Sequence, residues 1–166
     1  ADPFSGSAWA VTLTGEISSP DYSSDYDFSR FTASVRRYQK VSHYSTLLVR
    51  GMIGGSEGET PLHRTFYLGG LGTLHGYRHK ELMGSRFWMV NSEFRFTLPR
   101  TDIALAAIWD VAQIGFHGPL DDHIEVRHSL GGALYFGDDV RVSIARRLDG
   151  FADRNPRIFV RLEHVF

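Results

Sequence analysis

Apolar and polar residues alternate with a period of two along almost the whole chain. The stretch at residues 7–18, SAWAVTLTGEIS, is typical, because Trp9, Val11 and Leu13 fall on one face while Thr12 and Thr14 fall on the other. A period of two indicates a β-strand whose two faces meet different surroundings. No stretch carries a helical period, so the sequence predicts an all-β, antiparallel fold.

Eight such stretches are predicted as strands, and the connections between them alternate in length. The predicted strands cover residues 7–18, 28–39, 43–53, 85–98, 102–116, 127–136, 140–148 and 157–166. The connections after the second, fourth and sixth strands are short, and the others are long. The longest, residues 54–84, contains the glycine-rich stretch FYLGGLGTLHGYRHK. Short turns on one side and long loops on the other are typical of outer-membrane β-barrels. We therefore expect one transmembrane β-barrel domain over residues 1–166.

Composition excludes several other classes of protein. The chain has no cysteine, so neither a disulfide framework nor a thiolate metal site is possible. No run of 18 apolar residues is present, which excludes a spanning helix. The net charge of −1 and the lack of a long charge run argue against nucleic acid as a partner. The eight histidines show no zinc spacing, and no serine lies in a nucleophile-elbow motif, so we expect no metal, no cofactor and no catalytic site.

Alternating strands also build soluble sandwiches and lipocalin-like barrels. Three features favour the membrane barrel. Many strands carry Arg and Glu on the second face, which a soluble core would not bury unpaired. Aromatic residues such as Trp9, Tyr44 and Trp88 lie near strand ends, where interfacial girdles are expected. The chain also ends on Phe166, directly after an alternating strand.

The long loop carries a family resemblance. Its stretch FYLGGLGTLHGYRH resembles the sixth extracellular loop of the BamA- and TamA-type outer-membrane assembly superfamily, also called the bacterial surface antigen family. That loop reads roughly as Phe-Tyr-x-Gly-Gly followed by Val-Arg-Gly-Phe or Val-Arg-Gly-Tyr. The resemblance implies a loop-lock motif made by Gly69, Gly70, His75, Gly76 and Tyr77.

In that family the loop arginine points into the barrel and pairs with inward acids of the following strands. Here His75 takes the place of the arginine. Glu93, in NSEFRF, and Asp110, in IWDVA, correspond to the acids, and Ala112 stands where the second motif often has glycine. The resemblance implies that His75 pairs with one of these carboxylates, with Arg78 as a second cation close by.

The residues alone allow two interpretations of the two acids. Glu93 and Asp110 form either a paired-acid site or part of an inward salt-bridge network with Arg50, Arg95 or Arg86. We favour the network, because the second face carries Arg and Glu in many strands.

The last strand, with IFVRLEHVF, resembles the family's outer-membrane sorting signal, for which Val160, Leu162, His164 and Phe166 are the candidate residues. Three strands precede the loop and five follow it, as in the C-terminal half of the family's sixteen-stranded barrel. An eight-stranded barrel has room only for its own side chains. We therefore expect either a small closed barrel with the loop outside it, or half of a larger barrel completed by a second copy or a missing half.

Three functions remain open at this point. The resemblance implies a module that inserts, assembles or translocates outer-membrane proteins, with those proteins and outer-membrane lipids as partners. A second reading is a membrane anchor for a fused periplasmic enzyme of the patatin-like phospholipase type. A third is a small stand-alone barrel with a structural or dimeric role. All three place the chain in the bacterial outer membrane.

Overall fold

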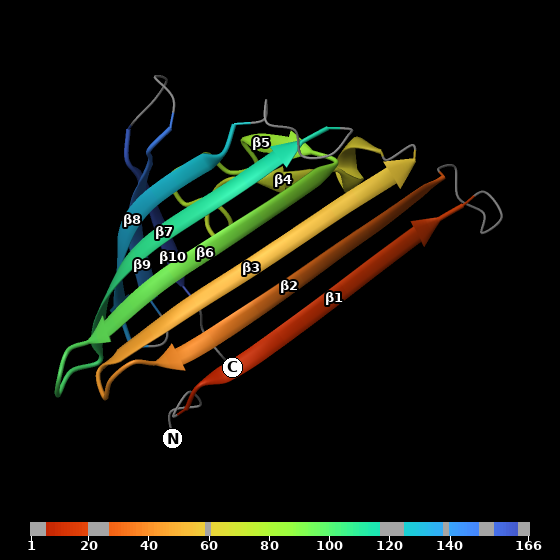
Figure 1. The fold of residues 1–166 in the computed structure, drawn as a ribbon. Helices are drawn as coiled ribbons and strands as arrows, with labels where there is room; N and C mark the ends of the chain where they lie inside the picture. The colour runs from red at the N-terminus through yellow and green to blue at the C-terminus, as the bar shows by residue number, and fades with distance from the viewer. Residues whose placement is uncertain are drawn as a thin grey trace.

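Eight antiparallel strands form one continuous sheet in the computed structural model (Figure 1), which describes residues 6–19, 27–58, 61–116, 125–137, 140–149 and 155–162. The strand order is β1-β2-β3-β6-β7-β8-β9-β10. The all-β, antiparallel fold predicted from the alternation is therefore confirmed. The strands of this sheet are β1 (Ala8–Ser18), β2 (Phe28–Lys40), β3 (Ser45–Gly58), β6 (Arg86–Thr97), β7 (Ile103–Gly115), β8 (Arg127–Phe136), β9 (Val140–Arg147) and β10 (Arg157–Leu162).

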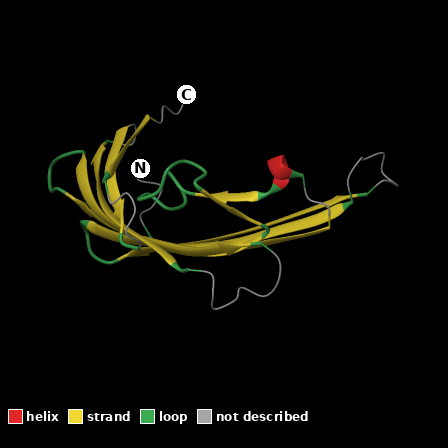
Figure 2. Cartoon of the chain, turned by 90° about the horizontal axis from the view of Figure 1, so that it is seen from above, coloured by secondary structure: helices red, strands yellow, loops and turns green. Residues whose placement is uncertain are grey.

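The connection between β3 and β6 has secondary structure of its own. It contains a short 3-10 helix, η2 (Leu62–Arg64), and a two-stranded sheet of β4 (Phe66–Leu68) and β5 (Leu82–Gly84). The segment between β4 and β5, residues 69–81, is called the clasp loop below. Figure 2 shows this hairpin lying within the concave side of the sheet.

Strand β3 continues to Gly58, whereas the sequence predicted that it ends at residue 53 and that the loop begins at residue 54. The glycines that suggested a loop serve another purpose. A Cβ atom at Gly54 would lie 2.4 Å from the ring of Phe87, and one at Gly55 would lie 2.8 Å from the ring of Phe31. The missing side chains therefore make room for aromatic rings above and below a paired strand.

The sheet register separates two chemically different faces. Trp9, Val11, Leu13 and Ile17 of β1 are 63–79% exposed and lie on one face with Phe31 of β2. A continuous apolar surface of this kind is unusual for a protein in water but suits contact with lipid. The other face is the concave one, which carries the clasp loop and most of the charged residues of the strands. These are called the outer and inner faces below.

The sheet is open in the part of the chain that the structure describes. Strands β1 and β10 are its two edges, and they do not pair with each other. The sheet curls most strongly over β7 to β10 (Figure 2). Of the two expected arrangements, the described strands therefore form an open half-barrel rather than a small closed ring. Among these residues, no helix is both long and apolar enough to cross a membrane.

Candidate functional site

The clasp loop folds back on itself through glycines in the left-handed region. Gly69 has φ 119° and Gly70 has φ 89°. A Cβ atom at Gly69 would lie 2.2 Å from the carbonyl oxygen of Arg78, so a side chain would push the two ends of the loop apart. The turn is closed by the Gly70 N–H, which donates to the Leu74 carbonyl at 3.0 Å. The Gly-Gly pair identified in the sequence is thus needed for the loop to be compact.

Apolar packing holds the loop against the inner face. Leu74 and Tyr77 are fully buried, and they belong to a cluster that includes Phe87 and Met89 of β6 and Ala112 of β7. Burying a large apolar side chain contributes about 1.5–3 kcal/mol relative to exposure in water. The clasp loop is therefore part of the buried core on the inner face and does not merely cover it.

Gly76 brings the loop backbone against β9. A Cβ atom there would lie 2.5 Å from the Arg146 carbonyl carbon and 2.5 Å from the Arg147 nitrogen. Any residue other than glycine would clash with backbone, which cannot rotate away as a side chain can. This close approach explains why glycine directly follows His75.

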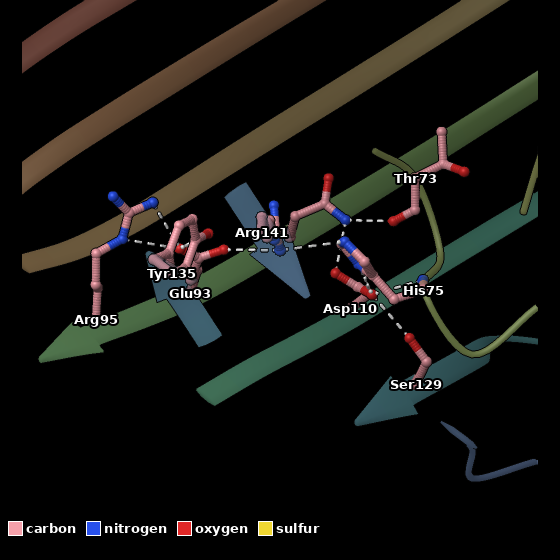
Figure 3. A network of polar contacts seen from close by, with 9 residues as sticks. Thr73, His75, Glu93, Arg95, Asp110, Ser129, Tyr135 and Arg141 are labelled. Atoms are coloured by element: carbon pink, nitrogen blue, oxygen red, sulfur yellow. Dashed lines mark hydrogen bonds and ion pairs between the residues drawn. The ribbon is translucent and has the colours of Figure 1, made fainter. Parts of the chain in front are cut away.

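Asp110 of β7 is the polar centre of the site. Its side chain is fully buried, and four donors surround it (Figure 3). The His75 backbone N–H and ring Nδ1 lie 3.0 and 2.9 Å from Oδ2, and the Ser129 hydroxyl donates to the same oxygen at 2.8 Å. The Asn91 amide donates to Oδ1 at 2.8 Å and also to the Thr73 carbonyl. A buried carboxylate is tolerable only with such partners, so Asp110 and the clasp loop depend on each other.

The contacts of His75 select one tautomer of its imidazole. Since the Asp110 carboxylate only accepts hydrogen bonds, Nδ1 carries the proton. Nε2 faces Nη2 of Arg141 at 3.4 Å, and a guanidinium can only donate. A neutral imidazole with the proton on Nδ1 satisfies both neighbours. The structure thus brings His75 to Asp110, one of the two acids that the resemblance implied.

Glu93 of β6 lies in a second group of contacts beside the first. Its Oε1 accepts from the Tyr135 hydroxyl at 2.6 Å and from Arg95 Nη2 at 3.0 Å. Its Oε2 accepts from Arg141 Nη2 at 3.0 Å. Glu93 is 7% exposed and makes no direct hydrogen bond to His75 among the contacts described; Arg141 joins the two.

A third set of contacts holds the far end of the loop. The Tyr77 hydroxyl donates to Asp149 Oδ1, and Arg127 donates to the other oxygen of this carboxylate at 2.9 Å. The Arg147 guanidinium lies 4.4 Å from the centre of the Tyr77 ring and also bonds Glu81. Burial, and then the hydrogen bond to Asp149, raise the pKa of Tyr77. Burial alone would raise the pKa of Asp149, but the bonds from Tyr77 and Arg127 outweigh it and lower that pKa.

The remaining sequence-predicted cations take different positions. Arg95 joins Glu93, as the network interpretation expected, while Arg50 donates to the Gly72 carbonyl of the clasp loop at 3.0 Å. Arg86 lies on the outer face and pairs with Glu57 at 2.9 Å, so the expectation that it joins the inward acids is wrong. The side chain of Arg78 is exposed, and its backbone N–H donates to Glu81.

The candidate sorting signal is described only in part. Val160 and Leu162 lie on the exposed outer face of β10, at 63% and 75% exposure. His164 and Phe166 lie outside the described residues.

The gathering of Ser129, His75 and Asp110 does not have the geometry of a hydrolase triad. The serine hydroxyl contacts the carboxylate, whereas nucleophilic catalysis needs it on the imidazole. Within the described ranges, no group of three or more His, Asp or Glu side chains could hold a metal ion. The arrangement is instead a mechanical one, in which a buried carboxylate fixes a loop.

The fold and the site together define a curved sheet of the membrane-barrel type with a loop clasped to its inner face. The chain belongs to the Omp85 superfamily, whose domain model matches residues 2–136. The resemblance inferred from the loop motif is thereby confirmed.

A crystal structure of BamA from Haemophilus ducreyi lacking POTRA domains 1-3 is similar to the chain, with a TM-score of 0.78 and 14% sequence identity. The match covers 97% of this chain and 40% of that one, so the chain spans well under half of that BamA protein. Among curated protein sequences, no significant match is found.

Sequence reasoning missed four of the residues that complete the site. The alternation placed Arg141 and Ser129 on strands, but only the folded sheet shows what they face. Asp149 lies in a loop, where an acid is expected to be solvated. The one usable signal was the inward position of Asn91, two residues before Glu93 on the same face. The missed residues are Asn91, Ser129, Arg141 and Asp149.

Proposed function

We propose that the chain is the outer-membrane β-barrel module of a BamA/TamA-like protein that acts in the insertion, assembly or translocation of outer-membrane proteins. The observation that carries the proposal is the clasp loop, fixed by Asp110 to the inner face of an open sheet, in a chain of the Omp85 superfamily. The roles of Gly69, Gly70, His75, Gly76 and Tyr77 as a loop lock are part of this proposal.

A position in the outer membrane is supported by the apolar outer face. In lipid, backbone N–H and C=O groups at an open strand edge would lack partners, at a cost of several kcal/mol each. Strands β1 and β10 must therefore be completed there. The rest of a larger barrel in the same protein, or a second copy, would supply these strands, and lipids would cover the apolar face.

The mechanism under this proposal is physical and needs no cofactor. An edge strand offers a row of unpaired backbone groups, which is a template for another strand. An outer-membrane protein arriving unfolded would pair with such an edge, while the clasp loop keeps the opposite part of the sheet in one curvature. This incoming protein, called the client below, needs only strands in which apolar and polar residues alternate.

The test is reconstitution of the intact protein that carries this chain into liposomes, followed by addition of an unfolded outer-membrane barrel. Folding of the client is followed over time by its heat-modified gel mobility. We expect faster folding than in liposomes that hold an unrelated barrel at the same density. Equal rates in the two preparations would refute the assembly role.

The same preparation separates the alternatives. A lipid-hydrolysing activity that stays with the membranes, together with no acceleration of client folding, would favour the anchor for a fused patatin-like enzyme. A dimer of this chain alone, again without acceleration, would favour the stand-alone barrel. Both outcomes are compatible with the half-barrel fold and with membership of the Omp85 superfamily.

A further inference from the structure

Arg141 connects two strands that are not neighbours in the sheet. Strands β7 and β8 lie between β6 and β9 in the strand order, so no backbone hydrogen bond can join β6 to β9. Nevertheless Arg141 of β9 reaches Glu93 of β6, with 3.0 Å between Nη2 and Oε2. The same Nη2 lies 3.4 Å from Nε2 of His75 in the clasp loop. Figure 3 shows the guanidinium between the two groups.

This contact is largely removed from solvent. The Glu93 side chain is 9% exposed, that of His75 is 7% exposed and that of Arg141 is 17% exposed. Charged hydrogen bonds are worth more at buried positions than at the surface, where screening reduces them. The contact also spans the concave side of the sheet, so it acts across the curvature rather than along one strand.

The charges of this group balance around a neutral imidazole. Glu93 and Asp110 supply two negative charges, and Arg95 and Arg141 supply two positive charges. Tyr135, whose ring lies under both guanidinium groups, adds a neutral hydroxyl. Arg95 stays on β6 beside Glu93, so Arg141 is the cation that joins different elements.

We infer that Arg141 is a positioning residue that holds the clasp loop from β9, by bonding Glu93 and His75 at once. This inference rests on the proposed function and deepens it, because it adds a residue of β9 to Asp110 among the strand residues that hold the loop. Without Arg141, Glu93 would keep Arg95 and Tyr135, but Nε2 of His75 would lose the donor that faces it. The link from Glu93 of β6 through Arg141 to His75 would then be broken, while Arg147 of β9 would still bond Glu81 at the far end of the loop.

A charge exchange between positions 75 and 141 gives the inference a specific test. Arginine at position 75 would bring a third cation beside Arg141, with only two carboxylates to balance it. Removing the charge of Arg141 at the same time restores the balance. A longer side chain at position 75 also brings its own donors toward Glu93. The two substitutions should therefore compensate for each other, which independent structural defects do not do.

The experiment measures hydrogen-exchange protection of residues 69–81 in the intact protein that carries this chain, purified in detergent micelles, with rates corrected for the intrinsic rate of each peptide. Arg141→Gln should lower the protection about tenfold or more, as expected for loss of a charged hydrogen bond. Arg141→Lys should restore part of it, because one donor and the charge remain. The matched control is Arg146→Gln, an exposed outer-face position on the same strand, which should leave the protection unchanged.

His75→Arg alone should lower the protection, and His75→Arg combined with Arg141→Gln should bring it back close to that of the native chain. Native protection in Arg141→Gln, or a loss in the double variant equal to the sum of the single losses, would overturn the inference. If Arg141→Gln does not fold, the test rests on the double variant with His75→Arg and Arg141→Gln. A folded double variant with a protected loop supports the exchange, and failure of both overturns it. No client protein is involved, so this result is independent of the assembly test above.

Discussion

The hydroxyl of Tyr77 is the clearest single atom to remove from the clasp loop. It donates to Asp149, and the ring around it is fully buried. Tyr77→Phe deletes this oxygen while keeping the packing of the ring against the apolar cluster and under Arg147. The substitution therefore isolates one hydrogen bond between the loop and the segment after β9.

The expected size follows from the charge of the acceptor. A hydrogen bond to a charged group contributes about 1.5–3 kcal/mol net. Asp149 keeps its bond from Arg127 at 2.9 Å, so the carboxylate is not left without a partner and the lower half of that range applies. A loss of about 1.5–2 kcal/mol corresponds to roughly a ten- to thirtyfold higher population of the open loop.

Hydrogen exchange of residues 69–81 measures this population in the folded protein. Tyr67→Phe is the matched control, because its hydroxyl donates to the Leu62 carbonyl at an exposed site outside the clasp loop. We expect Tyr77→Phe to speed exchange of the loop by at least about tenfold and Tyr67→Phe to have little effect. Equal exchange rates in the two variants would show that the Tyr77–Asp149 bond does not hold the loop.

Four further predictions concern the clasp loop and the end of the last strand. Asp110→Ala should cost about 3–5 kcal/mol, because it leaves buried donors without a partner; a melting temperature equal to that of the native chain would contradict this. Gly76→Ala should cost about 1–3 kcal/mol through its clash with the β9 backbone, measured by thermal unfolding against Gly72→Ala, where the added methyl meets open space but the positive φ remains. The pKa values of Asp149 and Glu81 are lowered by hydrogen bonds that outweigh burial, so their stabilisation is present above the unfolded pKa and is lost as pH falls through the folded one. Protease resistance of the loop should thus persist at pH 5 and fall below about pH 4; resistance unchanged at still lower pH would argue against these carboxylates. Deleting Phe166 should lower insertion into the outer membrane of cells, and undiminished insertion would remove the case for a sorting signal.

Much of the fold could be predicted because alternation is a local property. A strand of the sheet shows its two faces within about ten residues, and seven of the eight predicted strands keep their bounds to within about two residues where the structure describes them. The third strand was predicted too short because glycine is an ambiguous signal. At Gly54 and Gly55 it makes room for Phe87 and Phe31 within a paired strand, whereas at Gly69 it allows a turn.

The site could be predicted only where a motif marks it. The loop motif pointed to His75 and Asp110, which the structure brings together although 35 residues separate them. No local pattern marks the contact of Glu93 with Arg141, which are 48 residues apart. That contact depends on the curvature of four strands, and curvature is a property of the folded sheet.

The contacts of the clasp loop are unevenly distributed over the sheet, and this bears on the proposed mechanism. Its hydrogen bonds on this side reach β6, β7 and β9, through Asn91, Asp110 and Arg141. Toward β3 the described contacts of the loop include one hydrogen bond, from Arg50 to Gly72. Toward β1, η2 has the ion pair between Arg64 and Glu16, and both contacts are partly solvated. The loop thus fixes the curled half of the sheet and leaves the β1 edge held mainly by β2. Under the proposed mechanism, the β1 edge is therefore the one that would open to pair with an incoming strand.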